Sequence, residues 1–396
     1  MGSQREVVVT SGVRTPIGRF GGGFQSVPPT QLGAKVVQEA VRRSGVDSEA
    51  VGHTVFANVI HTDPHDMYMA RVVSVNGGLP VETPALTVNR LCGSGLQAIV
   101  SASQMLVLGD CDVAVAGGAE SMSRGAYWVP GARWGERMGD GVLLDATVGA
   151  LTDPFDDCHM GITAENVADQ WGVSREDQDK LAVESHQRAA RATEEGRFAD
   201  QILPVEVTSR RKTVTVDSDE HIRFDASVDS MAKLRPAFSK DGSVTAGNAA
   251  GMNDGAAAVV LMERGYAETN GHQPMARLVA YAFAGVEPRY MGTGPIPAVR
   301  RVLDLADLKV DDLDTIELNE AFAAQALAVM RDLSLPEERT NPNGSGISLG
   351  HPIGATGAVL TVKALYELER IDGRYALVTM CIGGGQGIAA IFERIS

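Results

Sequence analysis

Residues 89–96 read NRLCGSGL and are the most informative segment of the chain. Cys92 stands at the start of a predicted helix rich in small residues, which runs to about Leu108, and a predicted strand at 112–116 follows and ends in glycines. Unpaired N–H groups and the positive end of the helix dipole favour negative charge at a helix start. A thiol there is expected to have a pKa below its usual value of about 8.5, which makes Cys92 the candidate nucleophile.

The same order of elements returns near the other end of the chain. Residues 351–354, which read HPIG, open a predicted helix to about Leu368, and a predicted strand at 375–380 precedes Cys381 and a run of glycines. Near the start, predicted strands at 7–10 and 54–59 flank an amphipathic helix at 32–43. This pattern predicts an α/β fold with two duplicated halves whose loops meet at one rim.

The composition changes between residues 121 and 245. Trp128 and Trp134 appear there with acidic loops, and a charged helical stretch follows from 161 to 197. We interpret 121–245 as an insertion in the first half. Its second part concentrates basic residues in an otherwise acidic chain, and we expect phosphate groups to bind there. These residues are Arg210, Arg211, Lys212, Arg223, Lys233, Arg235 and Lys240.

The bulk composition excludes several classes of protein. A chain of 396 residues with 44% hydrophobic residues can bury a large core. The net charge of −15 argues against nonspecific nucleic-acid binding, which requires an excess of basic side chains. Apolar stretches are interrupted before the roughly 20 residues of a membrane span. With no recognisable signal peptide and with unpaired cysteine spacing, a cytoplasmic location is expected.

Other segments supply the polar groups that a reactive thiol needs. His351 lies in a rigid Gly-His-Pro sequence and is the candidate for proton transfer with Cys92. Cys381 precedes glycines whose N–H groups can approach a ligand, and a second thiol suggests a base for a carbon-bound proton. Asn319 follows a predicted strand at 315–318 and either caps the next helix or stabilises a developing enolate.

The remaining motifs predict no chemistry. The sequence DDCH at 156–159 lacks a second pair of ligands at zinc spacing, so no metal site is predicted. The glycine clusters at 21–23 and 383–387 lack the full dinucleotide-binding motif, so neither NAD nor FAD is predicted. Cys111 lies between two aspartates that disfavour a thiolate, and no role is assigned to it.

Taken together, these residues resemble the thiolase family, specifically acetyl-CoA C-acyltransferases of the biosynthetic, β-ketothiolase type. The likeness spans essentially the whole chain and is carried by residues 89–95, 117–123, 159–166, 230–238, 246–255, 319–325, 341–357 and 381–387. The resemblance implies a thiolase fold, in which two duplicated α/β halves form a five-layered α-β-α-β-α core with an inserted loop domain. The N-terminal half would consist of residues 1–120 with about 246–270. The loop domain that binds coenzyme A would be 121–245, and the C-terminal half would be 271–396.

The resemblance also implies roles for individual residues. Cys92 would be acylated by one thioester, His351 would activate it, and Cys381 would act as acid and base at the α-carbon. The acyl group would then pass to coenzyme A in thiolysis, or to an acetyl-CoA enolate in Claisen condensation. The N–H groups of Cys92 and Gly383 would form one oxyanion hole, for the tetrahedral intermediate. His351 and a water on Asn319 would form the other, for the enolate oxygen.

A pocket for coenzyme A and the acyl chain is implied as well. Its residues would be Leu151, His159, Met160, Arg223, Ser230, Phe238, Ala246, Gly247, Met291 and Phe322. Ala250 stands where the family carries a serine, and the lost hydrogen bond would weaken coenzyme A binding by roughly 0.5–1.5 kcal/mol. Cys158 replaces a residue that is often larger, so acyl chain length stays open, with ketoacyl chains slightly longer than acetoacetyl expected. Coenzyme A would be a substrate, no cofactor would be permanently bound, and the assembly would be a homotetramer built as a dimer of dimers.

Other functions remain open at the level of sequence. A ketoacyl synthase also uses a cysteine at a helix start, but Cys381 and the NEAF sequence at 319–322 oppose it. A cysteine hydrolase would use Cys92 and His351 with water as acceptor, and it gives Cys381 no role. A noncatalytic acyl-CoA-binding protein with the same fold is favoured only by the missing serine at position 250.

Overall fold

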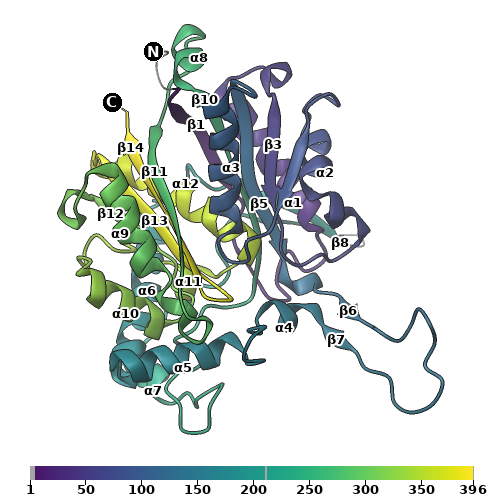
Figure 1. Cartoon of the computed structure of the whole chain (residues 1–396), viewed down its shortest axis with the longest axis vertical. Helices are drawn as coiled ribbons and strands as arrows, with labels where there is room; N and C mark the ends of the chain where they lie inside the picture. The colour runs from purple at the N-terminus through teal and green to yellow at the C-terminus, as the bar shows by residue number, and fades with distance from the viewer. Residues whose placement is uncertain (1–4, 210–211, 396) are drawn as a thin grey trace.

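The computed structural model describes residues 5–209 and 212–395 of the chain. Within these residues the framework is one large mixed sheet of ten strands (Figure 1). Its strands are β1 Val7–Arg14, β2 Gly18–Arg19, β3 His53–Ala57, β4 Ala85–Val88, β5 Val113–Ser121, β10 Asn253–Glu263, β11 Ala276–Gly285, β12 Thr315–Leu318, β13 Tyr375–Ile382 and β14 Gln386–Arg394. They are hydrogen-bonded in the order β12-β13-β14-β11-β1-β10-β5-β3-β4, and β2 pairs with β10.

The sheet consists of two similar halves joined by a short contact. In the first half β1 pairs antiparallel with β10, β10 antiparallel with β5, and β5 parallel with β3. In the second half β11, β14, β13 and β12 follow in the same order with the same strand directions. Among the described residues, the strands of the two halves are hydrogen-bonded to each other where β1 pairs with β11, at Val8 with Arg277 and Val9 with Ala276. The duplication predicted from the sequence is therefore present in the strand pairing.

Helices lie between the two halves and on their outer faces. They are α1 Pro29–Ser44, α2 Met69–Asn76, α3 Ser94–Leu108, α4 Ala146–Ala150, α5 Met160–Trp171, α6 Arg175–Glu194, α7 Val228–Ala232, α8 Arg264–Thr269, α9 Pro295–Ala306, α10 Ala323–Leu333, α11 Gly346–Leu349 and α12 Ile353–Ile371. α12 contacts β5 and β10 of one half and β12 and β13 of the other, and it packs on α3. α1 and α2 cover the first half, and α9 covers β11 and β14. The order of layers is α-β-α-β-α, as predicted.

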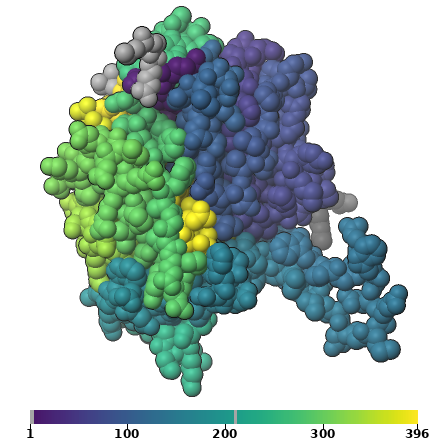
Figure 2. All heavy atoms as spheres, viewed as in Figure 1, coloured from purple at the N-terminus to yellow at the C-terminus, as the bar shows by residue number. Residues whose placement is uncertain are grey.

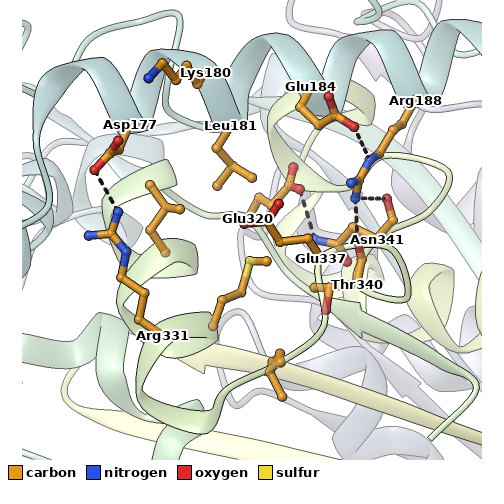
Figure 3. A pocket seen from close by; sticks show the side chains of 13 residues that line it. Asp177, Lys180, Leu181, Glu184, Arg188, Glu320, Arg331, Glu337, Thr340 and Asn341 are labelled. Atoms are coloured by element: carbon orange, nitrogen blue, oxygen red, sulfur yellow. Dashed lines mark hydrogen bonds and ion pairs between the residues drawn. The ribbon is translucent and has the colours of Figure 1, made fainter.

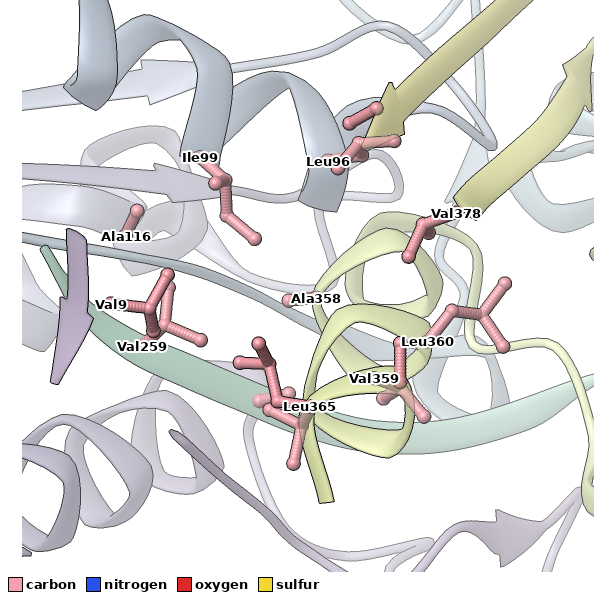
Figure 4. Close-up of a cluster of buried hydrophobic side chains, with 14 of the residues drawn as sticks. Val9, Leu96, Ile99, Ala116, Val259, Ala358, Val359, Leu360, Leu365 and Val378 are labelled. Carbon is pink, nitrogen blue, oxygen red and sulfur yellow. The ribbon is translucent and has the colours of Figure 1, made fainter. Parts of the chain in front are cut away.

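The core is centred on the two helices of the middle layer. Figure 4 shows Leu96 and Ile99 of α3 in one buried cluster with Leu365 of α12. The same cluster includes Val259 of β10 and Val378 of β13, one from each half of the sheet. These side chains are all buried almost completely, so removal of apolar surface from water holds the halves together.

The two central helices approach each other so closely that only glycine fits at the contact. A Cβ at Gly95 would lie 2.6 Å from the backbone nitrogen of Ala358, and real Cβ atoms essentially never come within 3.0 Å of such a neighbour. A Cβ at Gly357 would overlap the backbone nitrogen of Leu96. Since Cys92 and His351 lie just before these helices, this contact sets how near their loops come.

The segment between β5 and β10 adds helices and two hairpins to this core. β6 Tyr127–Trp128 pairs with β7 Leu144–Asp145 at the base of an arm, and β8 Val205–Ser209 pairs with β9 Lys212–Val216. In the space-filling view the arm stands clear of the body (Figure 2). α5 and α6 lie instead against α10, beneath the second half of the sheet (Figure 1).

Most predicted elements are present, with some boundaries shifted. The predicted charged helix at 161–197 is two helices, because Gly172 adopts a φ of 60° and ends α5. β5 continues through the glycines to Ser121, since β10 pairs with it along its whole length. By length and composition residues 91–108 could span a membrane, but 56% of this window is buried inside the structure, where α3 is a core helix.

A substitution at the helix contact tests its importance. Gly357→Ala places a Cβ against the backbone of α3, and we expect it to lower the stability by roughly 1–3 kcal/mol or more because a packed backbone cannot relax. Gly265→Ala in α8 is the control, since its Cβ would meet only the flexible carboxylate of Glu263 at 3.0 Å. Thermal unfolding followed by circular dichroism measures both, and equal melting temperatures would contradict the proposed constraint.

Candidate active site

Cys92 lies in a tight turn immediately before α3. The preceding residue, Leu91, adopts a φ of 44°, a left-handed conformation that is rare for a leucine. Its N–H group donates to Oδ1 of Asn89 at 2.9 Å, and Ser94 Oγ donates to the Leu91 carbonyl at 2.6 Å. These local bonds hold a conformation that turns the nucleophile toward the interface of the two halves.

The environment of Cys92 contradicts the prediction of an easily ionised thiol. Burial raises the pKa of Cys92 to about 11, although hydrogen bonds from the N–H groups of Gly383 and of Cys92 itself lower it. The charge of Glu120 raises it further. The predicted lowering was wrong because the cost of moving a thiolate out of water exceeds the stabilisation that a helix start supplies. Cys92 therefore stays protonated at neutral pH and needs a base.

His351 is the candidate for that base. Its side chain is buried, and burial lowers its pKa to about 4, so the imidazole is neutral at pH 7. Its backbone N–H donates to Oδ1 of Asn253 at 3.0 Å, and its Nε2 lies 3.5 Å from Nδ2 of Asn319. A neutral imidazole with a free ring nitrogen can accept a proton from a thiol.

Asn319 directly follows β12, and Cys381 lies near the end of β13, the neighbouring parallel strand. The N–H group of Asn319 donates to the Thr379 carbonyl at 3.0 Å, which places it beside the end of β13. α10 begins only after Phe322, so the alternative role of Asn319 as a helix cap was wrong. Among the described residues, its Oδ1 is buried and accepts no hydrogen bond, so it can receive one from water or substrate.

The second thiol is buried more deeply than the first. Burial raises the pKa of Cys381 far above its usual range, and the charge of Cys92 raises it further. The two sulfur atoms are therefore close enough to influence each other, although they belong to opposite halves. Gly383 lies two residues after Cys381, and its N–H group donates a hydrogen bond to the Cys92 sulfur.

An apolar cluster with an aromatic edge surrounds Cys381. It contains Met160, Met291 and Phe322, with Phe238 packed against them. The rings of His159 and Phe238 stack at 4.7 Å, and Phe238 meets Phe322 edge to face at 6.2 Å. A Cβ on Gly383 would lie 2.9 Å from the Met160 methyl group, so the methionine borders the loop that contacts Cys92. These side chains form an apolar wall suited to an acyl chain.

The other predicted pocket residues lie in more varied places. Leu151 packs in the cluster that contains Cys92, and its carbonyl accepts the N–H of Met160 at 2.8 Å. Gly247 is buried over Met231, whereas Ala246 is exposed.

Of the predicted polar positions, Arg223 and Ser230 are exposed, and Ser230 forms a capping box with Ser227 at α7. Arg210 and Arg211, part of the predicted phosphate-binding region, lie outside the described residues.

Two buried carboxylates that the sequence did not single out support the loops of the site. Glu120 accepts N–H groups of Val59 and Ile60 from the first half, and that of Gly354 from α12 at 2.8 Å. Burial raises its pKa to about 8, and these N–H groups act against that rise. Since each partner is distant in sequence, only its position at the end of a predicted strand could have suggested this role.

The second carboxylate, Glu320, anchors the loop that carries Asn319. Ser185 Oγ of α6 donates to it at 2.6 Å, and Nδ2 of Asn341 donates to it at 2.9 Å. Figure 3 shows Glu320 and Asn341 beside a cavity of about 500 Å³ between α6 and α10. This cavity shares no lining residue with the cluster around Cys381. Arg188 on its rim donates to the carbonyl groups of Thr340 and Asn341, the residue that bonds Glu320.

Comparison with known proteins identifies this arrangement. Residues 7–265 match the model of the thiolase N-terminal domain, and residues 272–394 match that of the thiolase C-terminal domain. The chain belongs to the thiolase family. Among curated thiolases it is 64% identical over 392 residues to the beta-ketothiolase BktB of Cupriavidus necator, covering 99% of this chain and 100% of that protein. It is 47% identical to an acetyl-CoA acetyltransferase of Syntrophomonas wolfei, with 99% and 100% covered.

Solved thiolase structures agree with the fold over the whole chain. The crystal structure of the Bacillus anthracis acetyl-CoA acetyltransferase superposes with a TM-score of 0.98 at 44% identity and covers 100% of both chains. That of human mitochondrial 3-ketoacyl-CoA thiolase in complex with CoA gives a TM-score of 0.96 at 41% identity and covers 99% of both. The predicted family and fold are confirmed.

The protonation states of the site can be tested by alkylation. At neutral pH we expect His351→Ala to slow iodoacetamide modification of Cys92 by roughly 100-fold, because no base remains to remove the thiol proton. In the variant the rate should rise with pH toward about 11, whereas the wild-type rate should fall as pH drops toward about 4 and His351 becomes protonated. Peptide mass spectrometry measures the rates, with Cys111 as the internal control. Equal Cys92 rates in both proteins would refute the role of His351.

Proposed function

We propose that this thiolase acts as a β-ketothiolase, an acetyl-CoA C-acyltransferase. It catalyses the reversible Claisen condensation of acetyl-CoA with an acyl-CoA and the thiolysis of 3-ketoacyl-CoA, through an acyl group on Cys92. The observation that carries the residue assignment is that the loop after Cys381 reaches the other half, where the N–H group of Gly383 bonds Cys92 and the charge of Cys92 acts on Cys381. One thiol can hold the acyl group while the other transfers a proton.

In the first half-reaction Cys92 attacks a thioester. Its proton passes to Nε2 of His351, and the sulfur attacks the carbonyl carbon. The N–H groups of Cys92 and Gly383, which already reach the sulfur, stabilise the negative oxygen that forms beside it. The bond to the coenzyme A sulfur then breaks, and Cys381 gives its proton to that leaving thiolate. The site is left with acyl-Cys92, protonated His351 and the thiolate of Cys381.

In the second half-reaction the Cys381 thiolate removes a proton from the α-carbon of acetyl-CoA. Because burial raises the pKa of Cys381 so far, its thiolate is a strong base. The enolate oxygen accepts hydrogen bonds from the protonated Nε2 of His351 and from a water on Asn319. The enolate carbon attacks acyl-Cys92, the carbon–sulfur bond breaks, and Cys92 recovers its proton from His351. The reverse sequence is thiolysis.

Coenzyme A is the substrate in this proposal, and no cofactor is permanently bound. The apolar wall of Met160, Met291 and Phe322 receives the acyl chain. Arg223 and Ser230 face the phosphates of coenzyme A. The other residues of the proposed pocket are Leu151, His159, Phe238, Ala246 and Gly247. Ala250 supports weaker binding, because its N–H donates to the Ala321 carbonyl beside Phe322 and its side chain offers no hydroxyl there. The loops that bind coenzyme A belong to the domain 121–245. One catalytic half consists of 1–120 with 246–270, and the other of 271–396.

Mass spectrometry after mixing with acetyl-CoA tests the reaction. We expect an acetyl group on Cys92 in the wild type and also, formed more slowly, in Cys381→Ala, because Cys92 makes the attack and water can protonate the leaving thiolate in place of Cys381. Exchange of the acetyl α-protons with deuterated water should be lost in Cys381→Ala, at least roughly 100-fold, because the base is gone. Unchanged exchange would overturn the assignment of Cys381.

The same assay separates the alternatives. Absence of any adduct would favour a noncatalytic acyl-CoA-binding protein. Release of acetate without free coenzyme A would favour a hydrolase, and condensation only with a malonyl donor would favour a ketoacyl synthase. Thiolysis rates with acetoacetyl-CoA and 3-ketopentanoyl-CoA compare chain lengths, and we expect both to be cleaved.

We also propose that the protein is a cytoplasmic homotetramer, built as a dimer of dimers. The arm between β6 and β7 supports assembly, because Trp134 is 87% exposed and Met138 is 97% exposed on a segment that extends from the body. Light scattering should give a mass of four chains. A monomer mass would refute the assembly without affecting the catalytic proposal.

A further inference from the structure

Thr356 lies in the first turn of α12 and contacts the ring of His351. Its side chain is 3% exposed, and its Oγ1 lies 2.6 Å from Nδ1 of His351. The same oxygen donates to the carbonyl of Pro352 at 2.9 Å. Within the described residues this hydroxyl is the only partner of Nδ1, so it faces the side of the ring away from Asn319.

A count of hydrogens determines which ring nitrogen carries the proton. The Thr356 hydroxyl has one proton and two acceptors within reach, Nδ1 of His351 and the Pro352 carbonyl. The amide nitrogen of Asn319 can only donate, so Nε2 of His351 accepts and the ring proton is on Nδ1. The Thr356 proton is then directed to Pro352. Thr356 Oγ1 therefore offers a lone pair to the N–H group of Nδ1. A neutral imidazole has one N–H group, which leaves Nε2 unprotonated.

We propose that Thr356 is a positioning residue that holds His351 in the one neutral tautomer able to accept the Cys92 proton. The inference rests on the proposed role of His351 as base. In the other tautomer Nε2 already carries hydrogen and cannot take a proton. After proton transfer Nδ1 still donates to Thr356, and Nε2 becomes the donor that the enolate oxygen needs. One hydroxyl thus serves both states of the ring.

A purely structural role for this hydroxyl is the competing explanation, because Thr356 also bonds back to the carbonyl four residues earlier. α12 contains a matched control. Thr361 is buried in the same helix and donates to the Gly357 carbonyl at 2.8 Å in the same way, but it contacts no histidine. Thr361→Val therefore removes the same kind of helix bond without touching the site.

The test compares Thr356→Val, Thr356→Ser and Thr361→Val in the alkylation assay of Cys92 and in steady-state thiolysis of acetoacetyl-CoA. We expect Thr356→Val to lower the alkylation rate and kcat by roughly 10- to 100-fold with little change in KM, because the tautomer is no longer selected. Thr356→Ser keeps the hydroxyl and should restore most of both rates. Thr361→Val should lose a similar amount of thermal stability and keep its rates.

Two outcomes overturn the inference: wild-type rates in folded Thr356→Val, or an equal loss of rate in Thr361→Val. Failure of Thr356→Ser to restore the rates would also count against it. His351→Ala distinguishes this failure from failure of the proposed function. If His351→Ala leaves the alkylation rate of Cys92 unchanged, the base is misassigned. If His351→Ala slows alkylation but Thr356→Val does not, only the role of Thr356 is refuted.

Discussion

The contact of backbone with backbone at Gly95 and Gly357 is the constraint on which the rest of the structure depends. Each half contributes one helix to the middle layer, and at these two glycines the backbones of the helices come into direct contact. The loops before these helices carry Cys92 and His351, so their separation is set by the closest approach that a polypeptide allows. A larger residue at either glycine would move the reacting groups as well as the core.

Burial is the second determinant of the chemistry. The same removal from water raises the pKa values of Cys92 and Cys381 and lowers that of His351, so at rest the site holds neutral thiols and a neutral base. Charge appears only when a proton moves, and it then forms beside N–H groups that are already oriented. Glu120 connects the two effects, because it bonds to the start of α12 and also raises the pKa of Cys92.

Local patterns were sufficient for much of the fold and for the principal side chains. The glycine-rich loops around Cys92, His351 and Cys381 are contiguous in sequence, so their unusual composition could be recognised without coordinates. Glu120 and Asn253 were missed because their partners lie far away along the chain: Gly354 is 234 residues from the first, and His351 is 98 from the second. The predicted ionisation of Cys92 was wrong for the same reason, since the side chains packed around it, among them Ile60, Met122 and Ile353, are distant from it in the sequence.

From the sequence alone follow the order of most strands and helices, their duplication, the family and the candidates for the reacting side chains. These follow from periodicity, turn residues and motifs, which are properties of short segments. The burial of these side chains and the hydrogen-bond partners of His351 became visible only in the folded structure. The physical reason is that protonation depends on desolvation and on hydrogen-bond partners, and folding supplies both from segments that are remote in the chain.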